Sequence, residues 1–302
     1  MGNEHDALRV ALGRVGAWTF AFDSRPVAEV RSDARAFETL GYSALWVPEG
    51  SASREVFGHL TLLAQATETI TVCSGIANIT ARAPDVMDHG ARTLADAFGT
   101  RTVLGVGVGH EYSTQARGGV WRGPLTRMRS YLDAMDAAPW YAPPSKVGVR
   151  RLLAALGDGM LRLSAERSLG AHTYFVPVSH TAHARAVLGP EPVLAVELTA
   201  VLEPDARRAR ETARGWTSRY LDLPNYARNL ERLGFGADEL AGGGSDRMID
   251  ATVAWGDEQV VAARVREHLD AGADHVCVQF VSGDDADVCM SAYRTLAPAA
   301  VS

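Results

Sequence analysis

Three glycines at alternate positions, Gly105, Gly107 and Gly109, end a strand-like run over 101–110, and His110 closes it. A histidine at the end of a strand can give or take a proton near neutral pH. Glycine lets a flat ring approach the backbone closely. The spacing does not fit a dinucleotide fingerprint, because His110 holds the place of its last glycine. Two interpretations stay open for the glycines, ring binding or tight packing inside a barrel, and His110 is either catalytic or structural.

A second candidate is the turn Gly157-Asp158-Gly159-Met160, which joins a strand-like run over 150–156 to a helix. Free N–H groups at the start of a helix, preceded by glycine, can bind a phosphate. The alternative is an ordinary turn in which Asp158 caps the helix.

Glu49 follows the strand-like run over 43–47 and is either a surface carboxylate or part of a site. His172 and His180 flank another run, but the chain has no His-x-His or His-Glu-x-x-His pattern, so we expect no metal site. The sequence also lacks the Gly-x-Ser-x-Gly elbow of a nucleophilic serine.

Strand-like runs alternate with amphipathic helical segments along the whole chain, which predicts a parallel sheet with ligands at the carboxyl ends of its strands. The eight runs are 10–17, 43–47, 71–79, 101–110, 150–156, 171–176, 192–202 and 274–281. We therefore predict one (β/α)8 TIM barrel over 1–302, with a helical insertion at about 223–250 and a long active-site loop over 111–123. Its wall should bury four valines: Val103, Val106, Val196 and Val276.

The composition narrows the class of protein. The net charge of -6 gives no reason to expect nucleic acid or an anionic membrane as a partner. We see no signal peptide at the start and no apolar stretch near the ~18 residues of a membrane span. The three cysteines are dispersed along the chain, which fits a reduced, cytoplasmic protein.

Several segments in order resemble one branch of the bacterial luciferase-like monooxygenase superfamily, the branch that uses the deazaflavin coenzyme F420. They read SGIANI at 74–79, LGVGVGH at 104–110, LAALGDGML at 153–161 and LPNY at 223–226. The start, LGRVGAWT at 12–19, and the end, GADHV at 272–276, also match. The resemblance implies a luciferase-like TIM barrel with an inserted segment, usually a homodimer.

The resemblance also implies a cofactor site. A bulge with a non-prolyl cis peptide backs the ring in relatives, and the matching bond here is Gly75–Ile76. His110 stands where sugar-phosphate-oxidising relatives have a catalytic glutamate, and Glu49 would orient the ring or the substrate. Gly50 replaces a histidine of several relatives, so that role is not carried over. The implied cofactor-binding residues are Trp18, Gly75, Ile76, Ala77, Asn78, Gly107, Gly109, Gly157, Asp158, Gly159 and Met160.

We therefore expect an F420-dependent oxidoreductase that transfers a hydride between the deazaflavin and a small organic substrate. One alternative is an FMN-dependent luciferase-like monooxygenase. Another is a non-catalytic, ligand-binding barrel, which Asp158 favours: the resemblance leads us to expect Gly-Pro-Lys at the phosphate turn, and Asp158-Gly159 puts an anion where a cation belongs.

Overall fold

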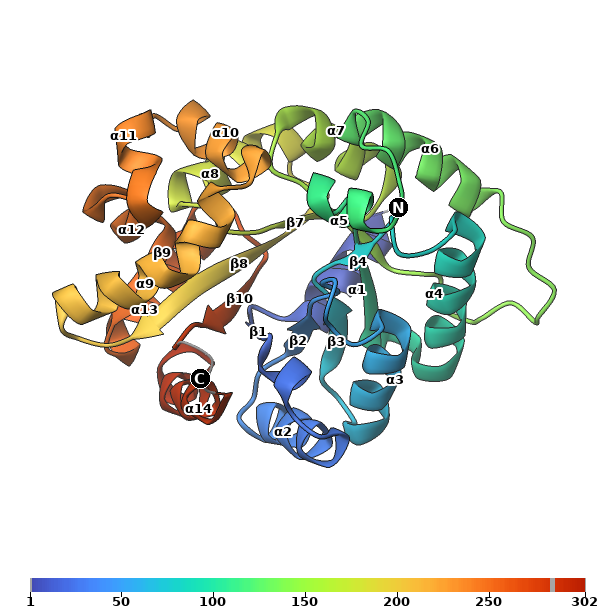
Figure 1. Cartoon of the computed structure of the whole chain (residues 1–302). Helices are drawn as coiled ribbons and strands as arrows, with labels where there is room; N and C mark the ends of the chain where they lie inside the picture. The colour runs from blue at the N-terminus through green and yellow to red at the C-terminus, as the bar shows by residue number, and fades with distance from the viewer. Residues whose placement is uncertain (1, 283–285, 302) are drawn as a thin grey trace.

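The computed structural model describes residues 2–282 and 286–301. Within these ranges, eight parallel strands close into a barrel, because β10 (His275–Phe280) pairs with both β1 (Val15–Trp18) and β8 (Val193–Leu202). The strands between them are, in order, β2 (Ala44–Val47), β3 (Thr71–Ser74), β5 (Thr102–Gly107), β6 (Arg151–Ala154) and β7 (Gly170–Thr173). Figure 1 shows these strands at the centre with helices around them. The predicted barrel is confirmed.

Helices follow every barrel strand and cover the barrel from outside. The main ones are α2 (Val27–Thr39), α3 (Val56–Ala66), α4 (Pro84–Phe98), α6 (Pro124–Asp136), α7 (Asp158–Arg167), α8 (Val178–Leu188), α13 (Glu258–Asp270) and α14 (Ala286–Ala300). In α4, Pro84 takes the first turn, where its missing N–H costs nothing, and Met87, Ala91 and Leu94 form one buried face. In α13, Asp257 caps the first turn.

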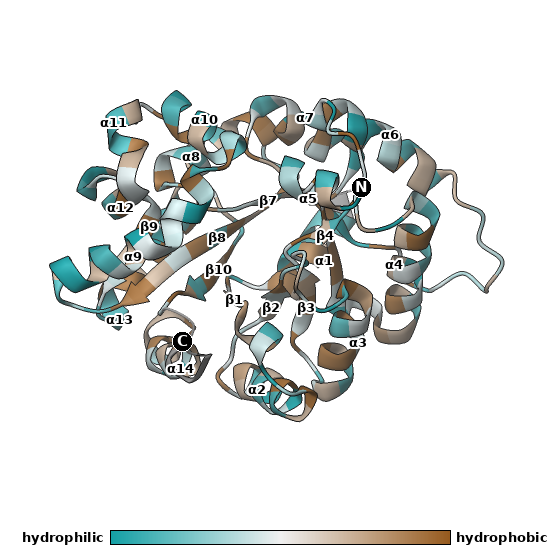
Figure 2. Cartoon of the chain, viewed as in Figure 1, coloured by the Kyte–Doolittle hydropathy of each residue, from teal (hydrophilic) through white to brown (hydrophobic). Residues whose placement is uncertain are grey.

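The segment between β8 and α13 is mainly helical. It begins with α9 (Ala206–Leu221), the helix after β8, and continues through the predicted insertion with α10 (Pro224–Arg232), α11 (Ala237–Leu240) and α12 (Asp246–Thr252). These helices gather on one side of the barrel in Figure 1, and much of their surface is hydrophilic in Figure 2. The insertion ends in a short strand that the pattern did not predict, β9 (Val253–Gly256), which pairs with the far end of β8.

The chain begins with a helix, α1 (Gly2–Leu12), and the prediction of a strand from residue 10 is wrong there. Leu8 and Leu12 lie one helical turn apart and are fully buried, whereas Val10 between them is 82% exposed. That is the pattern of a helix face rather than of a strand. The first strand starts only at Val15.

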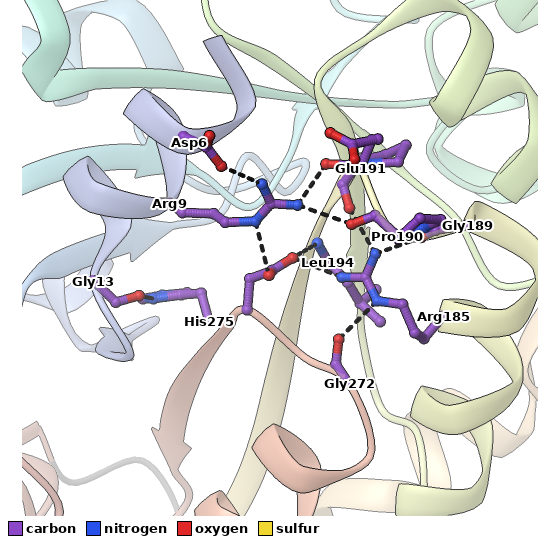
Figure 3. Close-up of polar contacts among 12 residues, drawn as sticks. Asp6, Arg9, Gly13, Arg185, Gly189, Pro190, Glu191, Leu194, Gly272 and His275 are labelled. Atoms are coloured by element: carbon purple, nitrogen blue, oxygen red, sulfur yellow. Dashed lines mark hydrogen bonds and ion pairs between the residues drawn. The ribbon is translucent and has the colours of Figure 1, made fainter. Parts of the chain in front are cut away.

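A carboxylate at the amino end of the barrel joins four elements. Asp274 accepts hydrogen bonds from Arg9 Nε of α1 at 2.9 Å, from Arg185 Nη2 of α8 at 2.6 Å and from the Leu194 N–H at 2.8 Å. Figure 3 shows Arg9 and Arg185 approaching the segment before β8 from two sides. Their guanidinium groups also donate to the carbonyl oxygens of Gly189, Pro190, Glu191, Pro192 and Gly272. We call this set of contacts the Asp274 clamp.

The side chains of the barrel wall are buried. Val103, Val106, Val196 and Val276 are all 1% exposed or less, as predicted. Trp18, Trp46 and Cys277 belong to a separate buried cluster with Val103. Over the described part of the chain, every helix is too short or too polar to cross a membrane.

Candidate active site at the carboxyl end of the barrel

A cavity of about 640 Å³ opens where the strands end. We call it the mouth cavity. Residues at or just after the ends of β1, β2, β3, β5, β6 and β7 line it, together with residues of α9 and of the start of the insertion. Its lining includes Trp18, Glu49, Gly75, Ile76, Asn78, Gly109, His110, Tyr112, Ala154, His172, Tyr174, Arg219, Tyr220 and Tyr226. Parallel strands bring their carboxyl ends to one edge, so residues far apart in sequence meet here.

The backbone after β3 forms part of this wall. The Gly75–Ile76 peptide is cis, and the two-residue strand β4 (Ala77–Asn78) that follows pairs with β5. Gly75 lies directly against the Trp18 indole, and a Cβ there would collide with Trp18 Nε1. Both Gly75 and Ile76 face the cavity, whereas Ala77 is fully buried and is not part of the lining.

The alternate glycines of β5 and of the residues after it divide between packing and lining. A Cβ on Gly105 would collide with the Ser74 carbonyl oxygen, and one on Gly107 would collide with Ile76. Gly107 is not part of the cavity lining. Its small size instead lets Ile76 pack against it, in the bulge formed by the Gly75–Ile76 cis peptide. Gly109 does face the cavity and has a φ of 67°, which favours glycine.

His110 stands at the cavity wall as the residue before helix α5 (Glu111–Ala116), which forms the start of the predicted active-site loop. Its backbone N–H donates to Ser113 Oγ at 3.2 Å, and its carbonyl oxygen accepts from the Thr114 N–H at 3.1 Å. The ring lies parallel to Tyr112, with 5.7 Å between the centroids. Burial lowers the pKa of His110, and a hydrogen bond with Asn225 offsets part of that effect. The imidazole is therefore mainly neutral at pH 7, and it can take or give a proton.

Glu49 is held in place by an arginine that the sequence pattern did not single out. Its carboxylate accepts from the Asn78 N–H at 2.8 Å and from both terminal nitrogens of Arg82, with Nη1 at 2.9 Å. Both side chains are buried, at 5% and 8% exposed. Arg82 also pairs with Glu55 at 3.1 Å. These contacts suit a carboxylate that fixes the wall between β2 and β4 better than one that moves a proton.

Three tyrosines meet at the cavity, Tyr174 after β7, Tyr220 in α9 and Tyr226 in α10, and no spacing in the sequence indicates their grouping. Tyr174 donates to Gln279 Oε1 at 2.8 Å, so the 2.8 Å bond between its hydroxyl and that of Tyr220 has Tyr220 as donor. Tyr226 packs against Tyr220 edge-on. Burial raises the pKa of all three hydroxyl groups, which keeps them neutral. Of the three, Tyr226 alone lies in a segment that carries the family resemblance, 223–226.

A second cavity, of about 610 Å³, lies at the amino end of α7, and we call it the α7 cavity. The predicted phosphate turn lines it, together with residues of α8 and α10: Gly157, Asp158, Gly159, Met160, His180, His183, Asn229 and Arg232. No side chain of the described residues caps the start of α7. The helix therefore offers its first N–H groups to this cavity.

The charge of Asp158 is compensated within the protein. Its carboxylate accepts from His183 Nε2 at 2.8 Å and from Arg162 at 3.4 Å, and the hydrogen bond with His183 contributes most to a lowered Asp158 pKa. Arg232 of α10 brings a cation to the turn, with Nη1 3.2 Å from where a Cβ on Gly157 would lie. The cavity thus has the cation that the turn sequence lacks.

Helix α10 borders both cavities. Tyr226 lines the mouth cavity, while Asn229 and Arg232 line the α7 cavity. Their spacing of three residues puts them along one side of the helix, over a rise of about 9 Å from Tyr226 to Arg232. Helix α10 therefore runs from the one cavity to the other.

Residues 10–275 match the model of the luciferase-like monooxygenase family, and the chain belongs to this family. The resemblance drawn from the sequence motifs is confirmed at that level. Two curated relatives are 5,10-methylenetetrahydromethanopterin reductases. The one from Methanolobus tindarius is 29% identical over 37% of this chain, and the one from Archaeoglobus fulgidus is 31% identical over 32% of it. The matched segments span about a third of these relatives, 34% and 29% of their lengths.

Solved structures with the same fold include both cofactor types. An F420-dependent secondary alcohol dehydrogenase and the coenzyme F420-dependent tetrahydromethanopterin reductase of Methanopyrus kandleri both superpose with a TM-score of 0.75, at 14% and 18% identity. Each superposition covers 95% of this chain. It covers 98% of the dehydrogenase chain and 99% of the reductase chain. The oxygenating constituent of 3,6-diketocamphane monooxygenase from Pseudomonas putida, in complex with FMN, has a TM-score of 0.69 at 14% identity, over 95% of this chain and 97% of that one. At these identities the likeness shows the fold alone.

Proposed function

We propose that this protein is an F420-dependent oxidoreductase that transfers a hydride between the deazaflavin and a small organic substrate. The observation that carries the proposal is the pair of cavities along α10. The mouth cavity has flat backbone and aromatic walls, and the α7 cavity has a helix amino end and the Arg232 cation. A ring cofactor with a phosphate on a short side chain needs both kinds of surface.

The residues fit such a cofactor. Gly75 and Ile76 offer backbone to the face of a ring, and Trp18 and Tyr174 border the same space. At the other end, the N–H groups of Asp158 and Gly159 and the guanidinium of Arg232 suit a phosphate. When bound, the deazaflavin supplies or accepts the hydride. The neutral imidazole of His110 would hold or deliver the accompanying proton, and Glu49 would keep the adjoining wall in shape.

The relatives support F420 as the cofactor. The curated matches are reductases, and two of the similar structures are described as F420-dependent. The FMN-bound monooxygenase of the same fold supports a second candidate, an FMN-dependent monooxygenase. The two cofactors differ at the ring position that reacts with oxygen, and either ring suits the mouth cavity.

A titration of the full chain with F420 and with FMN, followed by quenching of cofactor fluorescence, separates these functions. We expect saturable binding of F420 and weaker binding of FMN. Tighter binding of FMN would instead support the monooxygenase. If neither cofactor bound the wild type or Asp158→Lys, the result would support the non-catalytic, ligand-binding barrel. The resemblance also leads us to propose a homodimer, which a monomer by light scattering at micromolar concentration would contradict.

A further inference from the structure

Two polar atoms at the floor of the mouth cavity have no hydrogen-bond partner among the described residues. They are Trp18 Nε1 and His172 Nε2. Both residues line the cavity, yet they are only 1% and 2% exposed. A buried polar group normally has a partner, because leaving it unpaired costs its full desolvation. Two such atoms in one cavity floor therefore point to a ligand that forms hydrogen bonds with both of them.

The protonation of His172 follows from its other nitrogen. Its Nδ1 lies 3.3 Å from the carbonyl oxygen of Ala195, which can only accept. Nδ1 therefore carries the hydrogen, and Nε2 is left as an acceptor. Burial lowers the pKa of His172 to about 3, so the ring stays neutral at ordinary pH. Nε2 thus offers a lone pair and no proton.

The position of the His172 ring is fixed by its neighbours. Trp46 stacks on it, with 4.4 Å between the centroids and 14° between the planes. Trp46 is itself held by a hydrogen bond from its Nε1 to His275 Nε2 at 3.0 Å. The acceptor at His172 is therefore oriented before any ligand arrives.

Trp18 supplies the matching donor. An indole N–H can only donate. Trp18 is the register partner of Trp46 on the neighbouring strand, and its ring packs against Phe20 at 4.7 Å and Tyr174 at 5.3 Å. Its Nε1 lies beside Gly75, at the start of the bulge. The cavity lining thus includes one fixed donor beside the bulge and one fixed acceptor on β7.

We propose that Trp18 Nε1 and His172 Nε2 together bind the polar edge of the ring ligand. Trp18 would donate to a ring carbonyl, and His172 would accept from the ring N–H beside it. A carbonyl next to an N–H is the edge of a lactam or an imide, and the pyrimidinedione of both flavins and deazaflavins presents it. The inference rests on the proposed function for the identity of the ring, and it sets the way in which the ring enters: imide edge toward the barrel floor.

The test uses lumiflavin, which carries the flavin ring without a phosphate, and lumiflavin methylated on its imide nitrogen. The full chain is titrated with each, and binding is followed by quenching of flavin fluorescence. Wild type should bind lumiflavin about tenfold more tightly than the methylated ring, which has no N–H for His172. His172→Phe should abolish this preference. Trp18→Phe should weaken both rings about equally and keep the preference.

Trp216→Phe is the matched control. Trp216 Nε1 is also buried without a partner among the described residues, but Trp216 does not line the mouth cavity. This variant should bind both rings like the wild type. A measurement on the wild type alone guards against variants that fail to fold: the Trp18 indole N–H signal in a nitrogen-15 correlation spectrum should shift when lumiflavin is added.

The outcomes separate this inference from the proposed function. If F420 or FMN binds but both lumiflavins bind equally and the Trp18 indole signal does not move, the inference is overturned and the function stands. The inference is also overturned if Trp18→Phe and His172→Phe fold and bind the rings like the wild type. That result would make trapped water the hydrogen-bond partner of the two atoms. If lumiflavin, F420 and FMN all fail to bind the wild type, both proposals fall.

Discussion

Arg232 of the insertion lies against Gly157 at the amino end of α7: its Nη1 is 3.2 Å from where a Cβ on Gly157 would lie. A cation and the positive end of a helix thus meet in one cavity, although 75 residues separate them in the sequence. Asn229 holds the guanidinium from the same helix, accepting from Arg232 Nη2 at 3.0 Å. An anion placed there would meet donors from two elements.

Arg232→Ala should therefore weaken the binding of F420 or FMN by about tenfold to a hundredfold, the range of one charge-assisted hydrogen bond. It should leave lumiflavin binding unchanged, because that ring has no phosphate. Arg228→Ala, on an exposed position of the same helix, is the control and should bind every ligand normally. Equal losses for FMN and lumiflavin would show that Arg232 shapes the cavity and does not bind the phosphate.

Asp158→Lys should tighten the binding of the phosphate-bearing cofactor by roughly threefold to tenfold at low salt, since it replaces an anion at the turn by a cation. The gain is modest because His183 and Arg162 already compensate the Asp158 charge. Added salt should reduce it, since the side chain is about half exposed. Cofactor titrations at two salt concentrations check this. Unchanged or weaker binding at low salt would mean that no phosphate occupies the turn.

The sequence predicted the barrel and one half of its mouth. Strands with β-branched runs alternate with helices, and parallel strands end at one edge, so the pattern alone is enough to bring Glu49, Gly75, Asn78 and His110 together at that edge. The predicted first strand began too early because 10–12 is apolar, while the buried pair in α1 is spaced for a helix.

The other half of the site depends on packing that spacing does not encode. Tyr220 and Arg232 reach the two cavities only because α9 and the insertion pack at the carboxyl end of the barrel. Arg82 is plain in the sequence, but its pairing with Glu49 requires the bulge and β4 to bring the two segments together. His172 belongs to no motif, and the role we propose for it depends on a hydrogen bond to Ala195 on the neighbouring strand.

His110→Ala should lower turnover by about a hundredfold or more and leave cofactor affinity almost unchanged, if His110 moves a proton in the reaction. His110→Glu should keep part of the activity. Burial lowers the pKa of His110 below its ordinary 6.5, so the neutral ring persists at pH 7 and is lost as the pH falls through that lowered pKa. A reaction in which His110 is the base should therefore lose rate only on the acid side of about pH 6.5.

Turnover profiles of wild type and His110→Ala against pH, with a substrate found by screening, check this expectation. A lower melting temperature with nearly normal turnover would instead make His110 a packing residue that holds α5. Loss of cofactor binding with normal turnover at saturation would make it a contact of the ring.

Asp274→Ala should destabilise the fold by roughly 2 kcal/mol, because it leaves two partly buried guanidinium groups without their shared carboxylate. Asp6→Ala is the matched control, since Asp6 also pairs with Arg9 but its side chain is 74% exposed. That change should cost less than about 0.5 kcal/mol. Urea unfolding of both variants measures the difference. Equal effects would show that the Asp274 clamp contributes no more than a surface ion pair.

Glu197 is a carboxyl group buried in the barrel, where it forms no ion pair with the described residues. It is 0% exposed and accepts from the Phe175 N–H at 3.0 Å and from Thr199 Oγ at 2.7 Å. Burial raises its pKa from 4.5 to about 7, although both hydrogen bonds act in the other direction. Between these two pH values the native state holds a proton that the unfolded chain has lost. The contribution of this carboxyl to stability therefore falls as the pH rises from about 4.5 to about 7.

Glu197→Gln removes this titration and keeps an acceptor for Phe175. Relative to wild type, the variant should gain roughly 3 kcal/mol in its free energy of unfolding as the pH rises from 4.5 to 7. Glu203→Gln gives a control of opposite sign: the Asp205 N–H and Arg208 lower the pKa of Glu203, so that variant should lose stability relative to wild type as the pH rises. Urea unfolding at several pH values measures both trends. A difference between Glu197→Gln and wild type that stayed constant with pH would mean that Glu197 titrates alike in the folded and unfolded chain.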